Sequence, residues 1–261
     1  MSATSLSIDL NGDVGEWDST AADAATRFQG DAELALSLTS LNVACGGHAG
    51  DPGSMRRLAR LARDRGLALG AHPSFPDRSG FGRRAMALPP TEIERLVVEQ
   101  VSRLVRIAAE EGVDVGHVKP HGALYNLAAT DAAVAFCVAR AVARVNPKLV
   151  LVALSGSASI DAGARAGLTT ASEVFADRTY ESNGSLTPRT LAGSLLTDPE
   201  AAAARLVRMI REGSVTSRQG ALLHVAAATA CFHGDTPGSV DFARRIRAAL
   251  GAAGIAVASF A

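Results

Sequence analysis

The strongest constraint on the fold is an alternation of strand-like and helix-like segments along the whole chain of 261 residues. Short apolar runs are separated by longer stretches whose apolar residues recur with the helical period. This order predicts an α/β protein with a parallel sheet, either closed into a barrel or open and covered on both faces. The expected strands are Leu6–Asn11, Leu41–Cys45, Leu67–Ala71, Val115–Lys119, Leu149–Ala153, Thr170–Phe175, Ala221–Ala226 and Ile255–Ser259.

Polar residues on one side of these strands favour the closed barrel. Asp9 and Asn11 alternate with aliphatic residues in the first expected strand. In the fourth, His117, Lys119 and His121 share one side at a spacing of two. Strands of an open sheet covered by helices are apolar on both faces, whereas a barrel strand can face helices outside and a polar lumen inside. We therefore expect residues 1–261 to form a single (β/α) barrel domain.

The clearest helix is expected from Thr91 to Glu111, with Thr91 and Glu94 as a capping box and Gly112 after its end. Other helices are expected from about Pro52, from Pro199 to Ile210, and from Pro237 to Leu250. The helix that starts near Pro52 carries a row of arginines, which we interpret as a solvated face rather than an anion site.

Charge and cysteine content exclude several classes of protein. Lys+Arg and Asp+Glu number 26 each, so the formal net charge is zero and a nucleic-acid or anionic-membrane surface is not expected. Three cysteines cannot make a disulfide framework and suggest a reducing compartment. No signal peptide and no apolar run of membrane-spanning length are recognised. A cytoplasmic location is expected.

Charged and histidine-rich segments follow most of the expected strands, where α/β folds gather their functional groups. Five of the six histidines lie in such segments, whereas His224 lies in an apolar run and is interpreted as structural. The candidate catalytic residues are Asp13, Glu16, His72, Lys119 and His121. The candidate substrate- or nucleotide-binding residues are Asp9, Asn11, His48, Arg83, Tyr125, Asn126, Asp177, Arg178, His233 and Asp235.

Three kinds of chemistry are compatible with these residues. The first is metal-assisted hydrolysis, with Asp13, His48 and His72 as the candidate ligands, although compact metal-binding spacings are absent and no firmly bound metal is expected. The second is acid–base catalysis by carboxylates and imidazoles, with Lys119 stabilising negative charge. The third is nucleophilic catalysis, but G-x-S-x-G is absent and Cys45 is interpreted as a small buried residue.

A nucleotide site is not visible as a standard motif, because neither G-x-x-x-x-G-K-[ST] nor G-x-G-x-x-G after a strand occurs. Arginines in glycine-rich loops could still hold phosphates through bidentate hydrogen bonds. They are Arg83, Arg84, Arg178 and Arg189.

The same segments resemble the LamB/YcsF family of 5-oxoprolinase A subunits. The longest matches read V-K-P-H-G-A-L-Y-N, ending at Asn126, and A-D-R-x-Y, ending at Tyr180. The matching segments, in the family's order, are Ile8–Glu16, Ala44–Pro52, Gly70–Pro73, Gly80–Arg84, His117–Asn126, Glu173–Tyr180 and Cys231–Asp235. The departures are Gly12 and Val14 in the first segment, Gly47, the Ser74-Phe75 pair and Trp17, which put the substrate preference in question rather than the family.

The resemblance implies a distorted, seven-stranded (β/α) barrel of the glycoside hydrolase/deacetylase type. It also implies ATP-dependent hydrolysis of the cyclic amide 5-oxo-L-proline to L-glutamate, together with partner subunits B and C and with ATP, accompanied by Mg²⁺, as cosubstrate. In that reaction Lys119 and Arg83 would stabilise phosphate or oxyanion charge, His72 and His121 would orient substrate or move protons, and Asp13 and Glu16 would be candidate bases.

Two other functions remain compatible with the residues. One is a metal-dependent deacetylase or amidohydrolase that acts alone, without ATP. The other is a substrate-binding subunit whose partners break the bond.

Overall fold

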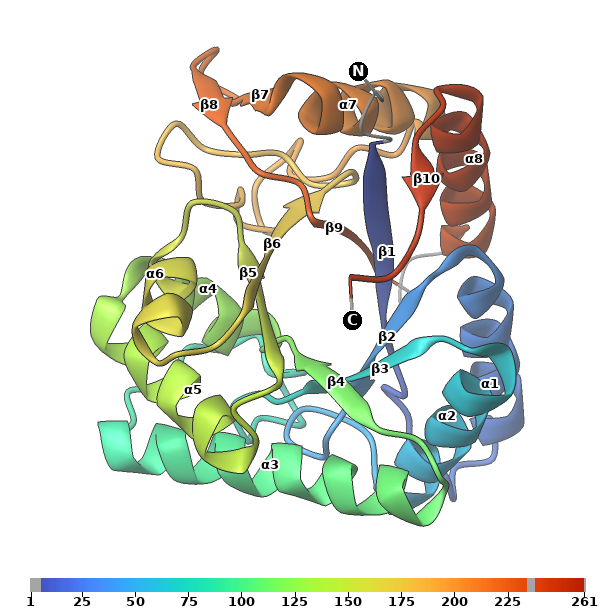
Figure 1. Ribbon diagram of the computed structural model, residues 1–261, viewed down its shortest axis with the longest axis vertical. Helices are drawn as coiled ribbons and strands as arrows, with labels where there is room; N and C mark the ends of the chain where they lie inside the picture. The colour runs from blue at the N-terminus through green and yellow to red at the C-terminus, as the bar shows by residue number, and fades with distance from the viewer. Residues whose placement is uncertain (1–5, 234–237, 261) are drawn as a thin grey trace.

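The computed structural model describes residues 6–233 and 238–260, and strands from this part of the chain close into a parallel seven-stranded barrel (Figure 1). The predicted distorted barrel is therefore confirmed. Neighbouring strands follow chain order, and the last strand pairs with the first to close the ring. The barrel strands are β1 (Ser7–Val14), β2 (Ser40–Ala44), β3 (Ala68–His72), β4 (Val115–Val118), β5 (Val150–Leu154), β6 (Thr170–Phe175) and β9 (Thr229–His233).

Helices surround the barrel, as Figure 1 shows. The α-helices are α1 (Ala24–Leu34), α2 (Pro52–Arg65), α3 (Pro90–Glu110), α4 (Gly122–Thr130), α5 (Ala132–Val145), α6 (Ala158–Arg165), α7 (Pro199–Glu212) and α8 (Ser239–Ala252), and a short 3₁₀ helix, η1, spans Ala35–Ser37. Among the described residues, no single helix is long and apolar enough to cross a membrane, and the bent pair α4–α5 meets that test only when both helices are taken together.

The seventh barrel strand was predicted in the wrong place. The apolar run Ala221–Ala226 contains only a short strand, β8 (Leu222–His224), which forms an antiparallel hairpin with β7 (Ser214–Thr216) outside the barrel. His224 is exposed there rather than packed in a core. The barrel strand is β9, in which Ala230 and Phe232 are fully buried on the outer side. Its alanine and threonine residues carry a weaker apolar signal than the preceding leucines, so the sequence pattern favours the hairpin segment over the true barrel strand.

The last expected strand, Ile255–Ser259, exists only as β10 (Ala256–Val257), which pairs with Ser7 and Ile8 at the amino end of β1. It lies beside the barrel and does not enter the ring. The chain then places the Phe260 ring 5.4 Å from the ring of His117. The C-terminal segment therefore covers the amino end of the barrel, opposite the end where a site is expected.

The helices cover the aliphatic outer face of the strands. In α3, the buried residues recur at the predicted helical spacing, beginning with Ile93, Val97 and Val101, and burial of each such side chain stabilises the fold by about 1.5–3 kcal/mol. The predicted capping box is wrong: the N-cap is Pro89, and no side chain caps this helix. Proline at the first helical position supplies a fitting φ and lacks an N–H that would otherwise need a partner.

The arginine row on α2 forms ion pairs at the surface, in agreement with its interpretation as a solvated face. Arg56 and Arg60 both contact the carboxylate of Glu111, at 2.7 and 2.6 Å. These guanidinium groups are thus used to join α2 to the end of α3.

The lumen is polar, as the alternation in β1 predicted. Near the amino end, the carboxyl group of Asp9 accepts hydrogen bonds from the hydroxyls of Thr39, Ser40 and Thr229. Burial raises the pKa of Asp9 above its ordinary value. Asp9 therefore belongs to a layer that joins strands inside the barrel, below the open end.

Gly70 of β3 makes room for the ring of His117 on β4. A Cβ atom at position 70 would lie 2.0 Å from His117 Nε2, and this buried ring already donates to Asn42 Oδ1 at 2.9 Å. We expect Gly70→Ala to lower the free energy of unfolding by about 3 kcal/mol, because the ring has to be displaced inside a packed lumen. Urea denaturation measures this loss.

Gly30→Ala in α1 is the matched control, since nothing lies within 4 Å of its added methyl group. It should raise stability by about 0.5–1 kcal/mol. Equal stabilities of Gly70→Ala and the wild type would contradict the packing of His117 against β3.

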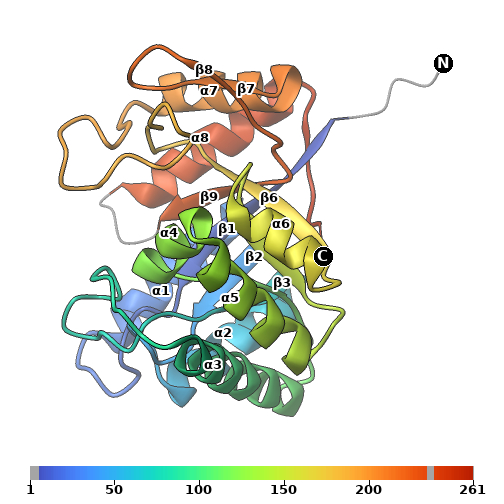
Figure 2. The same ribbon diagram turned by 90° about the vertical axis from the view of Figure 1, so that its left-hand side faces the viewer.

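The loops that follow the strands at their carboxyl ends lie together on one side of the barrel. In Figure 2 the loop between β3 and α3 and the loop between β6 and α7 both extend to the left, whereas the C-terminus lies on the right. Segments far apart in the sequence therefore meet at this rim.

Candidate functional site

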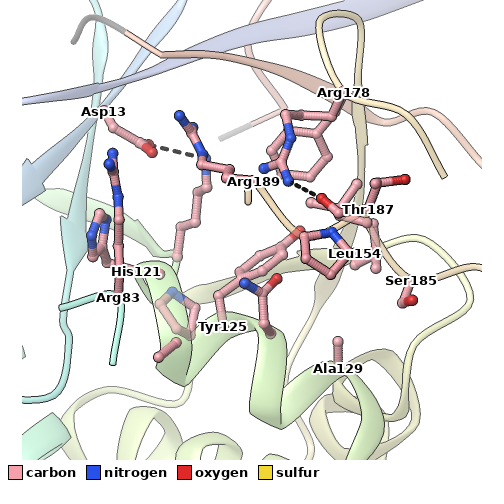
Figure 3. Close-up of a pocket in the computed structure, with 18 of the residues that line it drawn as sticks. Asp13, Arg83, His121, Tyr125, Ala129, Leu154, Arg178, Ser185, Thr187 and Arg189 are labelled. Atoms are coloured by element: carbon pink, nitrogen blue, oxygen red, sulfur yellow. Dashed lines mark hydrogen bonds and ion pairs between the residues drawn. The ribbon is translucent and has the colours of Figure 1, made fainter. Parts of the chain in front are cut away.

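A cavity of about 510 Å³ opens at the carboxyl ends of the strands. It has the size usual for small-molecule sites. Figure 3 shows Asp13, Arg83 and His121 on one side of it and Arg178 and Thr187 on the other, with Tyr125 between them. The predicted site residues that line it are Asp13, Glu16, His72, Arg83, Lys119, His121, Tyr125, Asn126 and Arg178. The structure thus brings all five candidate catalytic residues to one cavity.

Lys119 lies at the floor of this cavity and is 3% exposed. Its Nζ lies 3.0 Å from Asp13 Oδ1 and 2.9 Å from Glu173 Oε1, and it donates to Asn11 Oδ1 at 3.1 Å. Burial alone would lower the pKa of Lys119, but the nearby carboxylates hold it well above its ordinary value. Since an ammonium group has three donors, these partners engage Lys119 fully. Its ammonium group therefore links two buried carboxylates, those of Asp13 and Glu173.

Glu173 of β6 is the principal residue missing from the predicted site. It is fully buried and accepts hydrogen bonds from Asn11 Nδ2 at 2.9 Å and from the Tyr125 hydroxyl at 2.6 Å. Burial raises the pKa of Tyr125 well above its ordinary value, so the phenol keeps its proton and donates. The period of two along β6 places Glu173 on the lumen side and could have identified it.

His72 and His121 form a direct ring–ring contact above Asp13. His121 Nδ1 lies 2.9 Å from His72 Nε2, and the same His72 nitrogen lies 3.3 Å from Asp13 Oδ2. At the far side of each ring, His72 Nδ1 donates to the Lys119 carbonyl at 2.7 Å and His121 Nε2 donates to the Phe81 carbonyl at 2.9 Å. Both rings are therefore fixed in orientation by the backbone.

His48 joins this pair from the loop after β2. Its ring stacks on the ring of His121, with centroids 3.7 Å apart and planes 5° from parallel. Its Nε2 lies 3.0 Å from Glu16 Oε1, and its Nδ1 lies 2.9 Å from Ser74 Oγ. Burial lowers the pKa of His48 to about 2, and burial also lowers the pKa of His121 well below its ordinary value.

A tight turn in the β3–α3 loop presses against these rings. A Cβ at Gly82 would lie 2.8 Å from His48 Cβ and 2.9 Å from His121 Cδ2, and the backbone there has a φ of +65°. Phe81, the only non-glycine residue with positive φ among those the structure describes, has a φ of 55°. Such backbone costs about 1–3 kcal/mol and is common at functional sites. Here it aims the Phe81 carbonyl at His121.

Asp31 of α1 fixes the loop that carries Glu16. Its Oδ2 accepts from the Gly15 N–H at 2.9 Å and from Trp17 Nε1 at 2.7 Å. Trp17, a departure from the expected pattern, is thus part of an anchor that holds both neighbours of Glu16.

The carboxyl group of Asp31 should make the stability of the fold depend on pH. Burial raises the pKa of Asp31 from 3.8 to about 6. The folded chain therefore retains a proton that the unfolded chain releases, so this group's contribution to stability falls as pH rises through that interval. Asp31→Asn should remove the fall. The difference in unfolding free energy between the variant and the wild type should shift in favour of the variant by on the order of 2 kcal/mol from pH 4 to pH 7. This figure allows for partial solvent screening of the carboxyl group. Superimposable pH–stability profiles would contradict this.

A buried arginine, Arg178, lies on the side of the cavity opposite Asp13 and His121 (Figure 3). Arg178 is 6% exposed, and its Nη2 donates to the Thr187 carbonyl at 2.6 Å. Its Nε has no hydrogen-bond partner within the described part of the chain. Arg83 and Arg189 also line the cavity. A buried guanidinium with an unused donor suits an anionic group on a ligand.

Of the other predicted residues, some lie away from this cavity and some have side chains outside the described part of the chain. Asp177 lines a separate cavity of about 330 Å³ formed with residues near α7 and α8. Arg84 is paired with Asp77. His233 is the last residue of β9, and Asp235 lies outside the described residues. Cys45 is buried, as interpreted, and burial raises the pKa of its thiol to about 12.

One group of side chains has the composition of a metal site. The nearest ligand atoms of Glu16, His48, His72 and His121 all lie within 4.8 Å of one another. Of the candidate set predicted from sequence, His48 and His72 belong to this group, and Asp13 lies directly beside it.

The chain is similar to known proteins over almost its whole length. The model of the LamB/YcsF family matches residues 8–261. A protein of Heliobacterium modesticaldum, named as the A subunit of 5-oxoprolinase, is 48% identical over 252 residues, which cover 97% of each chain. One of the same name from Geobacillus kaustophilus is 50% identical over 96% of this chain and 95% of its own. The crystal structure of a lactam utilization protein from Thermus thermophilus superposes with a TM-score of 0.87 at 41% identity, covering 98% of this chain and all of that one.

Proposed function

This chain belongs to the LamB/YcsF family, and from that premise we propose that it is the A subunit of a 5-oxoprolinase. The reaction is the ATP-dependent opening of the 5-oxo-L-proline ring to give L-glutamate, ADP and phosphate. The chain would act in a complex with subunits B and C. The proposal is supported by relatives of that name, which are 46–50% identical to this chain over nearly its whole length.

The observation that carries the proposal is the cavity that brings acid–base groups together with the guanidinium groups of Arg83, Arg178 and Arg189. A cyclic amide is a poor electrophile, so its hydrolysis needs activation of the carbonyl group and of water. Transfer of the ATP γ-phosphoryl group to the lactam oxygen would make the ring carbon electrophilic, and water would then add to this carbon. The ring C–N bond would break as the nitrogen takes up a proton, and hydrolysis of the resulting acyl phosphate would release L-glutamate and phosphate. Cations are required for the first step and a base for the second.

Asp13 is our candidate for the base. Its Oδ1 is held by Lys119 and by Asn42 Nδ2 at 2.8 Å, while Oδ2 faces His72 at the cavity. A carboxylate fixed on one side and adjacent to an imidazole on the other can accept a proton from water and pass it on. Glu16 remains the second candidate, and Lys119 acts as a positioning residue.

Arg178 is our candidate for the carboxylate group of the substrate. The unused Nε donor of this buried side chain and the neighbouring Arg189 supply the charge that such a group requires. ATP, with Mg²⁺, is proposed to act on the substrate within the assembled complex. Arg83 of this chain is proposed to bind the phosphate groups. Its Cζ lies over the Phe81 ring, 5.0 Å from the ring centroid.

Reconstitution tests the function directly. The chain purified alone, the partner proteins alone and the full mixture are assayed for glutamate release from 5-oxoproline with and without ATP. Turnover only in the full mixture with ATP is the expected result. Release of glutamate by the partners without this chain would overturn the proposal.

The histidine–glutamate group favours one alternative, a metal-dependent amidohydrolase that acts alone. In the same assay this alternative predicts ATP-independent hydrolysis by the isolated chain after loading with a divalent metal.

A cytoplasmic location is also proposed, since the three cysteines, Cys45, Cys137 and Cys231, are all free and buried.

A further inference from the structure

The three histidines at the cavity rim are held in one orientation by groups behind them. His72 Nδ1 donates to the Lys119 carbonyl and His121 Nε2 donates to the Phe81 carbonyl. For His48, the Ser74 hydroxyl donates to the Phe75 carbonyl at 3.0 Å, so Ser74 Oγ is left to accept from His48 Nδ1. The outer nitrogen of every ring therefore carries a hydrogen that is already committed.

The second nitrogen of each ring, on the side facing Glu16, therefore has no hydrogen and directs its lone pair toward the space between the three rings and Glu16. His72 Nε2 and His121 Nδ1 are 2.9 Å apart, and His48 Nε2 lies 3.0 Å from Glu16 Oε1. Glu16 Oε1 also lies 3.6 Å from His121 Nδ1. Neutral imidazole nitrogens and a carboxylate oxygen repel each other at these distances unless positive charge lies between them. One shared proton would relieve one such contact, whereas a central cation would relieve all of them.

We infer that Glu16, His48, His72 and His121 form a binding site for a divalent transition-metal ion. Metal-binding histidines characteristically donate their second N–H to a backbone carbonyl, a hydroxyl or a carboxylate, which fixes the ring and its tautomer. All three rings have such a partner in this chain. The glycine at position 82 allows the β3–α3 loop to press against two of them.

The donor set indicates the class of metal. Three imidazole nitrogens and one carboxylate oxygen suit Zn²⁺, Co²⁺, Ni²⁺ or Fe²⁺, whereas Mg²⁺ and Ca²⁺ prefer oxygen ligands. His72, His121 and Glu16 also line the cavity, so an ion held by them would face it. There it could polarise a lactam carbonyl or a water molecule next to Asp13.

Metal content tests the inference without any turnover, so its outcome does not depend on the proposed function. The untagged full chain is stripped with a chelator, loaded separately with Zn²⁺ and Co²⁺, and freed of excess ion. Elemental analysis should find about one equivalent per chain. The Co²⁺ form should show ligand-field absorption that changes when Zn²⁺ displaces the cobalt.

Variants locate the ion. His121→Asn should abolish stoichiometric binding, and Glu16→Gln, at a partly exposed position, should weaken it by more than 100-fold. Ser74→Ala removes the hydroxyl that accepts from His48 Nδ1 and donates to the Phe75 carbonyl, and it should weaken affinity about 10–100-fold. His224→Ala is the matched control, because this histidine is exposed on the β7–β8 hairpin; it should bind like the wild type.

Two results would overturn the site. One is a loaded wild-type chain that retains no metal above the level of a stripped one. The other is unchanged affinity in Glu16→Gln and Ser74→Ala, both verified as folded by circular dichroism, which would locate any bound ion elsewhere.

Discussion

Lys119→Met is expected to lower the free energy of unfolding by about 3–5 kcal/mol, the usual cost of leaving buried charges without their partner. Lys119 is the ammonium group between two carboxylates, and Asp13 and Glu173 are 7% and 0% exposed. Methionine fills a similar volume but carries no charge. For a chain of this size the loss corresponds to a fall in Tm of roughly 10 °C, which calorimetry measures. Turnover of the assembled enzyme should fall with it by about 10²-fold or more, because Asp13 loses the group that holds it.

The chain provides a close control in Lys148, its only other lysine. Lys148 is exposed before β5, so Lys148→Met should change stability by no more than about 0.5 kcal/mol. If Lys119→Met matched this control in stability, the two carboxylates would not depend on the lysine as the distances indicate. Full turnover at temperatures where the variant is folded would remove Lys119 from the mechanism.

The barrel was predictable because the alternation within its strands is visible in the sequence. Asp9 and Asn11 on β1, and His117 on β4, point into the lumen of the barrel, as their spacing in the sequence indicated. The position of β9 was not predictable, because strand periodicity alone does not distinguish a barrel strand from an exposed hairpin. What identifies β9 as the seventh barrel strand is its pairing with both β1 and β6 in the folded structure.

Most members of the site were predictable, but Glu173 was missed and the contacts between the residues were not predictable. Strand ends of a parallel barrel meet at one rim, so Asp13, His72, Lys119 and His121 could be expected together. The ion pair between Lys119 and Glu173 was not predictable, because it depends on which side chains lie opposite each other across the lumen. Asp177 shows the converse limit, because a loop residue two positions beyond β6 turns into a different cavity.

Asp13→Asn is expected to reduce turnover by about 10²–10⁴-fold, the range for loss of a general base. Asparagine has nearly the same shape. Its amide oxygen can keep the hydrogen bonds that Asp13 Oδ1 accepts from Lys119 Nζ at 3.0 Å and Asn42 Nδ2 at 2.8 Å. The unfolding free energy should therefore fall by no more than about 2 kcal/mol. The measurement is glutamate release by the reconstituted complex, with kcat and KM determined separately.

The separation of kcat from KM identifies the role of Asp13. A base acts in the transition state, so its loss lowers kcat and leaves KM nearly unchanged, whereas loss of a binding contact raises KM. Asp114→Asn, at an exposed position before β4, is the control for the change of charge and should match the wild type in both constants. A raised KM with an unchanged kcat in Asp13→Asn would make Asp13 a binding residue and leave Glu16 as the base. An unchanged kcat/KM would exclude Asp13 from both roles, because the carboxylate that Lys119 holds at the cavity floor would then make no contribution to the reaction.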